Sequence, residues 1–261
     1  MHHTHIDRIA SLNSPVHSMD PRAKLLTTLI FIFMVVLTPD GYFASFGLYA
    51  LSLGLVISIS CVPLKFILLR SLAIMPFALA VSVFVPFITA GTGVLWEFNA
   101  GPFEAQVSDT GFFRFISMNL RVLICFFATI ILVSSTRFGD LMQAAGMLGL
   151  PSKIVAVMSF MYRYLFIVID EAAHMMLARD LRSYKQQRLS MLHATGGIIG
   201  ALFVRSFEHS ERLYMSMLLR GYSGRPVTPA EMHLTNRDVV YSALFLVVAL
   251  LGFVAGRGIY A

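Results

Sequence analysis

The sequence predicts an all-α integral membrane protein with about five transmembrane helices and long amphipathic cytoplasmic helices. Three observations support this prediction. Hydrophobic residues make up 57% of the 261 residues and charged residues only 13%, whereas a soluble domain carries about 25% charged residues. Five apolar stretches approach the roughly 20 residues that a helix needs to cross a bilayer. A further region, 136–238, is basic and holds 12 of the 20 Lys and Arg residues.

Local turn and charge signals bound the five predicted spans. The first ends at the turn sequence Thr38-Pro39-Asp40-Gly41, and Pro63 closes the second. Pro76 and Pro86 lie in the third, where a membrane helix tolerates them if neighbouring groups satisfy the freed carbonyls. The spans are expected at 22–38, 42–60, 71–90, 112–135 and 239–256.

A sixth apolar patch lies at 154–169 and is interrupted by Arg163. It fits either a sixth span or a helix packed against the others. A sixth span would place the following basic helix outside the cell, against the positive-inside rule. We therefore favour a partly embedded or interfacial helix, and the six-span alternative stays open.

The distribution of charge predicts the orientation. With the N-terminus in the cytoplasm, 17 of the 20 Lys and Arg residues fall inside, and the loop 91–111 outside carries three acids and no Lys or Arg. No cleavable signal peptide is expected, and the net charge of +6 reflects this orientation rather than nucleic-acid binding. The chain is thus expected in the inner membrane, divided into a cytoplasmic segment 1–21, spans one to four at 22–135, a cytoplasmic or interfacial region 136–238, and the last span with the C-terminus at 239–261.

Two amphipathic helices are expected in the region 136–238, at 170–188 and 204–220. Asp170 and Glu171 would start the first, which suits the helix dipole, and Gly221 would cap the second with a positive φ. Arg179 and Arg220 lie 41 residues apart, and guanidinium forks of this kind can bind carboxylates of a partner. The alternative is that both are solvated charges or bind lipid phosphates.

Motifs for catalysis are missing from the sequence. It contains no GxxxxGK[ST], HExxH or GxSxG, so we expect no nucleotide site, no catalytic residues and no cofactor. No metal site is expected either. Asp170 and His174 are only two ligands. His2, His3 and His5 could bind a divalent cation, but they fall on the cytoplasmic side.

Arg114 and Arg121 stand seven residues apart in the fourth predicted span. Intramembrane arginines are functional candidates by default. Arg114 can extend to the outer interface. Arg121 lies deeper, and we interpret it as a possible contact to a partner subunit within the membrane.

The N-terminal run Ile6–Ala10, followed by Ser14–His17 and Met19–Lys24, resembles the entry to the first span in the CbiQ family. CbiQ proteins are the transmembrane T-components of cobalt energy-coupling factor (ECF) transporters. Two Ala-Arg-small motifs are typical of their coupling helices. Ala178-Arg179-Asp180 is similar to the first motif, with Asp in place of the small residue. Leu219-Arg220-Gly221 is similar to the second, with Leu in place of Ala.

The resemblance implies a non-catalytic subunit that connects two cytoplasmic ABC ATPases to a substrate-binding membrane subunit. It implies Co²⁺ as the transported species, and related systems carry Ni²⁺. It also assigns Arg179 and Arg220 to ATPase docking. Two alternatives remain, a self-sufficient secondary transporter and an integral membrane enzyme. The first usually shows internal repeats and paired polar residues at mid-membrane, which we do not find here.

Overall fold

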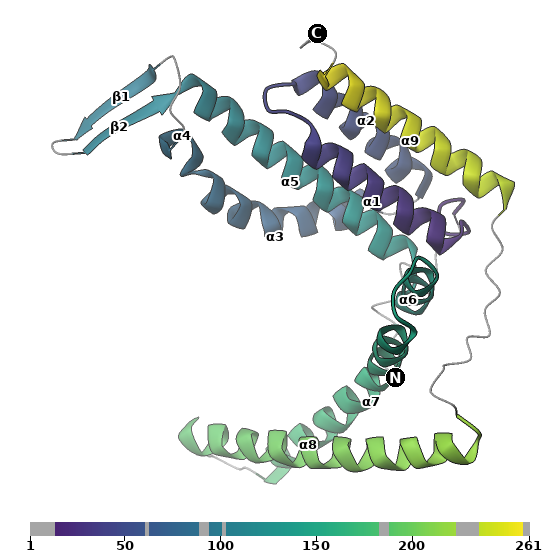
Figure 1. The fold of residues 1–261 in the computed structure, drawn as a ribbon. Helices are drawn as coiled ribbons and strands as arrows, with labels where there is room; N and C mark the ends of the chain where they lie inside the picture. The colour runs from purple at the N-terminus through teal and green to yellow at the C-terminus, as the bar shows by residue number, and fades with distance from the viewer. Residues whose placement is uncertain are drawn as a thin grey trace. The chain divides into compact units, whose positions relative to one another are not determined.

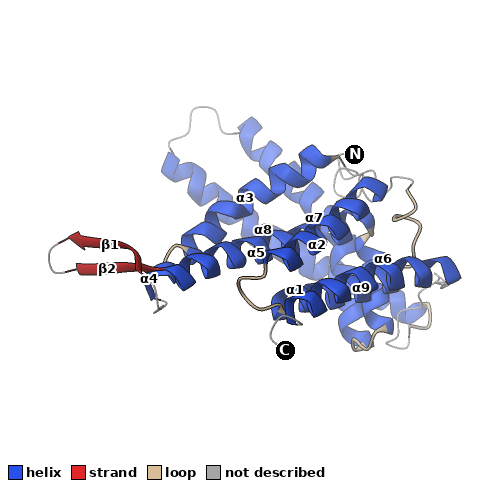
Figure 2. Ribbon diagram, turned by 90° about the horizontal axis from the view of Figure 1, so that it is seen from above, coloured by secondary structure: helices blue, strands red, loops and turns tan. Residues whose placement is uncertain are grey.

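The computed structural model describes residues 14–60, 63–88, 94–100, 103–182, 188–222 and 235–257, as drawn in Figures 1 and 2. The chain divides into two compact units. The bundle unit comprises the chain up to 137 and from 231, and the paired-helix unit comprises 138–230. The bundle unit contains α1 (Pro21–Leu37), α2 (Phe43–Ser60), α3 (Leu64–Ser82), α4 (Val85–Ile88), β1 (Val94–Ala100), β2 (Phe103–Ser108), α5 (Asp109–Ser135) and α9 (Asn236–Arg257). The paired-helix unit contains α6 (Phe138–Met147), α7 (Ser152–Arg182) and α8 (Arg188–Leu219).

The helical class predicted from composition is confirmed, with one addition. In the loop that was expected between the third and fourth spans, β1 and β2 form an antiparallel hairpin in which Glu97 pairs with Gln106. The hairpin leads directly into α5 (Figure 2). At the same end of α5, Gly111 lies against α4, because a Cβ there would stand 2.8 Å from the Cα of Pro86.

In the described part of the chain, five helices are long and apolar enough to cross a membrane, namely α2, α3, α5, α7 and α9. The number agrees with the prediction, but the set differs. α1 has 17 residues and is about 26 Å long at 1.5 Å per residue, somewhat short of the roughly 30 Å hydrocarbon core. α7 joins the set instead.

α7 is one continuous helix of 31 residues. The prediction that 154–169 and 170–188 form separate segments was therefore wrong. Arg163 does not interrupt the helix, because its side chain is exposed on the helix surface. Asp170 and Glu171 consequently lie in the interior of α7 and not at a helix start, so the dipole argument does not apply to them.

α1 and α5 pack antiparallel in a register that two polar contacts fix. Asp20 caps α1 by accepting a hydrogen bond from the amide of Arg22 at 2.8 Å. One turn later, the buried Lys24 donates to the carbonyl of Ser135, the last residue of α5, at 3.2 Å. This places a positive charge at the negative end of the α5 dipole. Fourteen residues further along α1, the carbonyl of Thr38 accepts a bond from Arg121 of α5 at 2.6 Å.

α9 packs against α2 through two glycines one turn apart, Gly252 and Gly256. A Cβ on Gly252 would lie 3.0 Å from the ring of Tyr49, and one on Gly256 would lie 2.9 Å from Ser45 Oγ. This is the small-xxx-small arrangement that lets membrane helices approach closely. The buried Tyr49 also packs edge-on against Phe31 of α1 at 5.6 Å, so three helices meet at this point.

Candidate functional site

The paired-helix unit places α7 and α8 side by side and antiparallel. Glu171 of α7 forms an ion pair with Arg205 of α8. On one side of this pair, the rings of Tyr164 and His209 lie 5.6 Å apart. Arg179 contacts α8 on the other side. The three contacts join α7 residues 164–179 to α8 residues 195–209, a stretch of about 22 Å.

Arg179 is held within its own chain. Its Nε and Nη2 both donate to Asp180 Oδ1, at 2.9 and 2.8 Å, and its Nη1 donates to Thr195 Oγ1 at 2.9 Å. The Arg179 side chain is 17% exposed, whereas that of Asp180 is 56% exposed. The guanidinium therefore joins the end of α7 to α8 and presents the carboxylate of Asp180 at the surface.

Arg220 lies just beyond α8 in a different environment. The amide of Gly221 donates to Leu218 O and that of Tyr222 to Met217 O, both at 3.0 Å. This pair of bonds is the Schellman motif, and Gly221 has the φ of +79° that it requires. The predicted cap is thus confirmed. The Arg220 side chain is exposed, and no described residue forms an ion pair or a hydrogen bond with it.

The two arginines are far apart along the unit. Arg179 contacts α8 at Thr195, and Arg220 follows 25 residues later. At 1.5 Å per residue this separates the two points by about 38 Å along the helix axis. A single pocket on one partner does not reach across such a distance.

Exposed apolar side chains accompany both arginines. Next to Arg179, Leu177 and Leu181 are 59% and 79% exposed, and Leu219 beside Arg220 is 90% exposed. Between them, α8 exposes Ile199, Phe203 and Phe207 at a spacing of four residues. Exposed apolar side chains in this density are typical of a surface that a partner or a membrane covers.

Arg121 has a partner that sequence reasoning missed. Its Nη2 donates to Thr38 O at 2.6 Å and to Asp40 Oδ1 at 3.0 Å. Arg114 contacts the other oxygen of the same carboxylate, with its Nε 3.5 Å from Asp40 Oδ2. Asp40 belongs to the turn after α1, outside the predicted spans, so a search for acids within the spans could not find it. The ion pair connects this turn to α5.

Two further expectations concern metal ligands. Within the described part of the chain, no group of three or more His, Cys, Asp or Glu side chains is placed to hold a metal ion. His2, His3 and His5 lie outside the described residues. Of Asp170, Glu171 and His174, Glu171 forms an ion pair with Arg205.

Fold and site together define a multi-pass membrane protein that carries a separate pair of long helices. Comparison with known proteins identifies the family. Residues 12–232 match the model of the CbiQ family, described as cobalt transport protein. The chain is 25% identical over 260 residues to an uncharacterized protein of Methanocaldococcus jannaschii, covering 97% of this chain and 87% of that one.

Two named relatives agree with this match. The energy-coupling factor transporter transmembrane protein EcfT of Staphylococcus aureus is 24% identical over 264 residues, covering 95% and 96% of the two chains. The cobalt transport protein CbiQ of Rhodobacter capsulatus is 25% identical over 138 residues, covering 53% and 56%. The chain belongs to the CbiQ family, whose members include transmembrane components of ECF transporters.

Proposed function

We propose that this chain is the transmembrane coupling subunit of an ECF-type ABC importer for cobalt ions. In this role it links ATP hydrolysis by cytoplasmic ATPase subunits to a separate substrate-binding membrane subunit. It catalyses no reaction itself and holds no cofactor. The supporting observation is the paired-helix unit, in which two arginines mark docking points about 38 Å apart along α8.

The separation of the arginines supports two ATPase subunits rather than one. Each point combines a charged group with exposed leucines, Leu181 beside Arg179 and Leu219 beside Arg220. A partner that buried Leu219 and offered a carboxylate could bind at Arg220. At the other point a partner would bury Leu181 and meet the exposed carboxylate of Asp180. Movement of two ATPases towards each other would then act on two points that α8 connects.

The two arginines act differently in this proposal. Arg220 is exposed and meets a carboxylate of the ATPase directly. Arg179 is engaged by Asp180 and Thr195, so it keeps the end of α7 in place. In the motif Ala178-Arg179-Asp180, the arginine therefore holds the docking surface in place. In Leu219-Arg220-Gly221, the exposed guanidinium at the capped end of α8 contacts the partner itself.

Orientation follows from the same proposal. ATPases work in the cytoplasm, so in this proposal the paired-helix unit and the N-terminus lie on the cytoplasmic side of the inner membrane. α7 then does not cross the bilayer, although it is long and apolar enough to do so, and the five spans are α1, α2, α3, α5 and α9. The positive-inside count supports this placement. The turn with Asp40 and the β1–β2 hairpin then lie towards the opposite side.

Cobalt is the proposed cargo because the family model and a named relative both carry cobalt in their descriptions. Nickel or another substrate is the alternative, since EcfT relatives name no substrate. Substrate recognition is assigned to the partner membrane subunit. Arg121 is not proposed as a contact to that subunit, because its Nη2 already donates to Thr38 O and Asp40 Oδ1 within this chain.

Co-purification tests the coupling role. The tagged chain is expressed with candidate ABC ATPase subunits, as wild type and as the Arg179→Ala/Arg220→Ala double variant. Arg212→Ala is the matched control, since Arg212 is another exposed arginine of α8 that pairs only weakly with Glu208 at 3.7 Å. A charged hydrogen bond contributes about 1.5–3 kcal/mol, so Arg220→Ala alone should weaken binding about ten- to hundredfold. Arg179→Ala should weaken binding indirectly, because it releases the end of α7 from α8.

The proposal predicts that ATPase is retained by the wild type and by the control and is lost from the double variant. If all three chains retained the ATPase equally, the two arginines would not be part of the docking site. If no ATPase is retained by the wild type, while the chain alone moves cobalt in liposomes, the secondary-transporter alternative replaces the proposal.

A further inference from the structure

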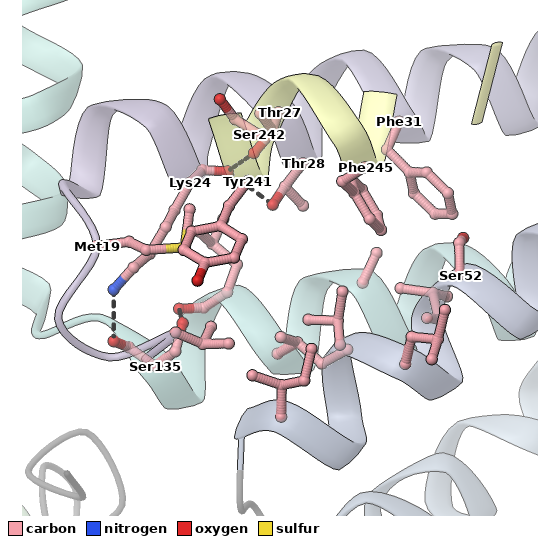
Figure 3. Close-up of a pocket in the computed structure, with 18 of the residues that line it drawn as sticks. Met19, Lys24, Thr27, Thr28, Phe31, Ser52, Ser135, Tyr241, Ser242 and Phe245 are labelled. Atoms are coloured by element: carbon pink, nitrogen blue, oxygen red, sulfur yellow. Dashed lines mark hydrogen bonds between the residues drawn. The ribbon is translucent and has the colours of Figure 1, made fainter. Parts of the chain in front are cut away.

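The bundle unit contains a cavity of about 450 Å³ between α1, α2, α5 and α9 (Figure 3). Pro15, Val16 and Met19, from the segment before α1, also line it. Each helix lines it with a stretch of about eight residues. Seven residue steps correspond to about 10 Å along a helix, so all four helices give the cavity the same depth. The lining stretches are 24–31 of α1, 52–59 of α2, 128–135 of α5 and 241–248 of α9.

The cavity is polar at one end and mostly apolar along the rest, where the hydroxyls of Thr27, Thr28 and Ser52 donate to carbonyls of their own helices. At the polar end, Lys24 donates to the carbonyl of Ser135, and Tyr241 and Ser242 lie close by (Figure 3). At the other end, Phe31 and Phe245 are in contact, with ring centroids 5.0 Å apart. The polar end coincides with the beginning of α1 and the end of α5, and so with one boundary of the bilayer.

Part of the cavity wall belongs to the outer surface of the bundle. Leu55 and Ile59 of α2 are 55% and 48% exposed, and Leu244 of α9 is 64% exposed. α2 and α9 are held close at Gly252 and Gly256, and the cavity lies between them at their opposite ends. α2 and α9 are both long and apolar enough to span the membrane, so the exposed wall would face lipid in a bilayer.

We propose that this cavity binds one acyl chain of a membrane phospholipid, which enters between α2 and α9. The depth of about 10 Å fits within one leaflet, half of the roughly 30 Å hydrocarbon core. The apolar wall offers too few polar partners for a water cluster. The hydroxyls of Tyr241 and Ser242 lie where the ester groups of such a lipid would sit. This inference is independent of the coupling role.

Quenching by a brominated lipid tests the proposal. The 261-residue chain carries a single tryptophan, which Trp96→Phe removes so that Phe245→Trp can serve as a reporter in the cavity. Leu72→Trp is the matched control, because Leu72 of α3 is 71% exposed and does not line the cavity. Dibromostearoyl phosphatidylcholine is titrated into the protein in detergent micelles, and tryptophan fluorescence is followed.

The expected result is saturable quenching of the Phe245→Trp reporter at one lipid per chain, with only gradual quenching of the control. Filling the cavity with Ala128→Leu or Val56→Phe should abolish the saturable phase. The two fillings come from different helices, so misfolding of one leaves the other as a test. Gradual quenching of both reporters would overturn the proposal. A change in reporter emission caused only by a partner membrane subunit would overturn it too, in favour of a partner helix.

Discussion

Replacement of Arg121 by Met is expected to lower the free energy of unfolding of the bundle unit by about 3 kcal/mol. The guanidinium makes two bonds through Nη2, at 2.6 Å to Thr38 O and at 3.0 Å to Asp40 Oδ1. Hydrogen bonds of charged groups contribute about 1.5–3 kcal/mol each. Because the Asp40 side chain is 37% exposed, solvent screens the ion pair and the lower value applies to it.

A double-mutant cycle separates the ion pair from the carbonyl bond. Arg121→Met, Asp40→Asn and the double variant are unfolded in detergent micelles and followed by circular dichroism. The coupling energy between the two sites should be about 1.5 kcal/mol. Arg114→Met is the matched control, since Arg114 is 55% exposed and 3.5 Å from the same carboxylate, and it should change stability by less than about 1 kcal/mol.

The reasoning is refuted in either of two ways. A coupling energy below about 0.5 kcal/mol would mean that Asp40 does not stabilise Arg121. A loss for Arg114→Met as large as that for Arg121→Met would mean that burial does not distinguish the two arginines. In the first case the turn after α1 would be held to α5 by the bond from Arg121 to Thr38 O and by the bond from the Gly41 amide to Ser117 Oγ.

Three further predictions concern backbone packing and the paired-helix unit. Gly256→Val should lower the free energy of unfolding in detergent by about 1–3 kcal/mol, because the larger side chain overpacks against Ser45. The control Gly54→Val should change that free energy by less than about 1 kcal/mol, because a Cβ at Gly54 meets nothing within 4 Å. Gly221→Ala should lower the local stability at the end of α8 by about 1–2 kcal/mol, because Gly221 has a positive φ. Amide hydrogen exchange there should become faster. The control Gly197→Ala lies within α8 in open space and should slow amide exchange or leave it unchanged. Arg179→Lys should speed amide exchange at the end of α7, since an ammonium cannot replace three guanidinium bonds; unchanged exchange would contradict the positioning role.

Sequence reasoning worked where a feature depends on nearby residues. The cap at Gly221 follows from a glycine after a helix rich in leucine and methionine, and its φ of +79° agrees. The turn at Thr38–Gly41 ends α1 as expected. Apolar length alone identified α2, α5 and α9 as candidate spans. In each case the physical cause is local propensity or burial in lipid. The third span was placed too late, at 71–90, because α3 runs from Leu64 to Ser82 and already contains Lys65 and Arg70. Pro86 consequently lies in α4 and not in the third span.

Features that depend on distant residues could not be predicted. Asp40 and Arg121 are 81 residues apart in the chain, and only packing of α1 on α5 brings them together. The engagement of Arg179 by Thr195 depends on the pairing of α7 with α8. The continuity of α7 was missed for a different reason, because Asp170 and Glu171 were interpreted as the start of a new helix, whereas α7 runs through them.

The most direct test of the account is cobalt uptake into proteoliposomes that contain the chain, an ABC ATPase pair and a candidate substrate-binding membrane subunit. The account predicts uptake only when all these components and ATP are present, and loss of uptake in the Arg179→Ala/Arg220→Ala variant. Uptake by the chain alone, without ATP, would contradict the claim that it is a coupling subunit.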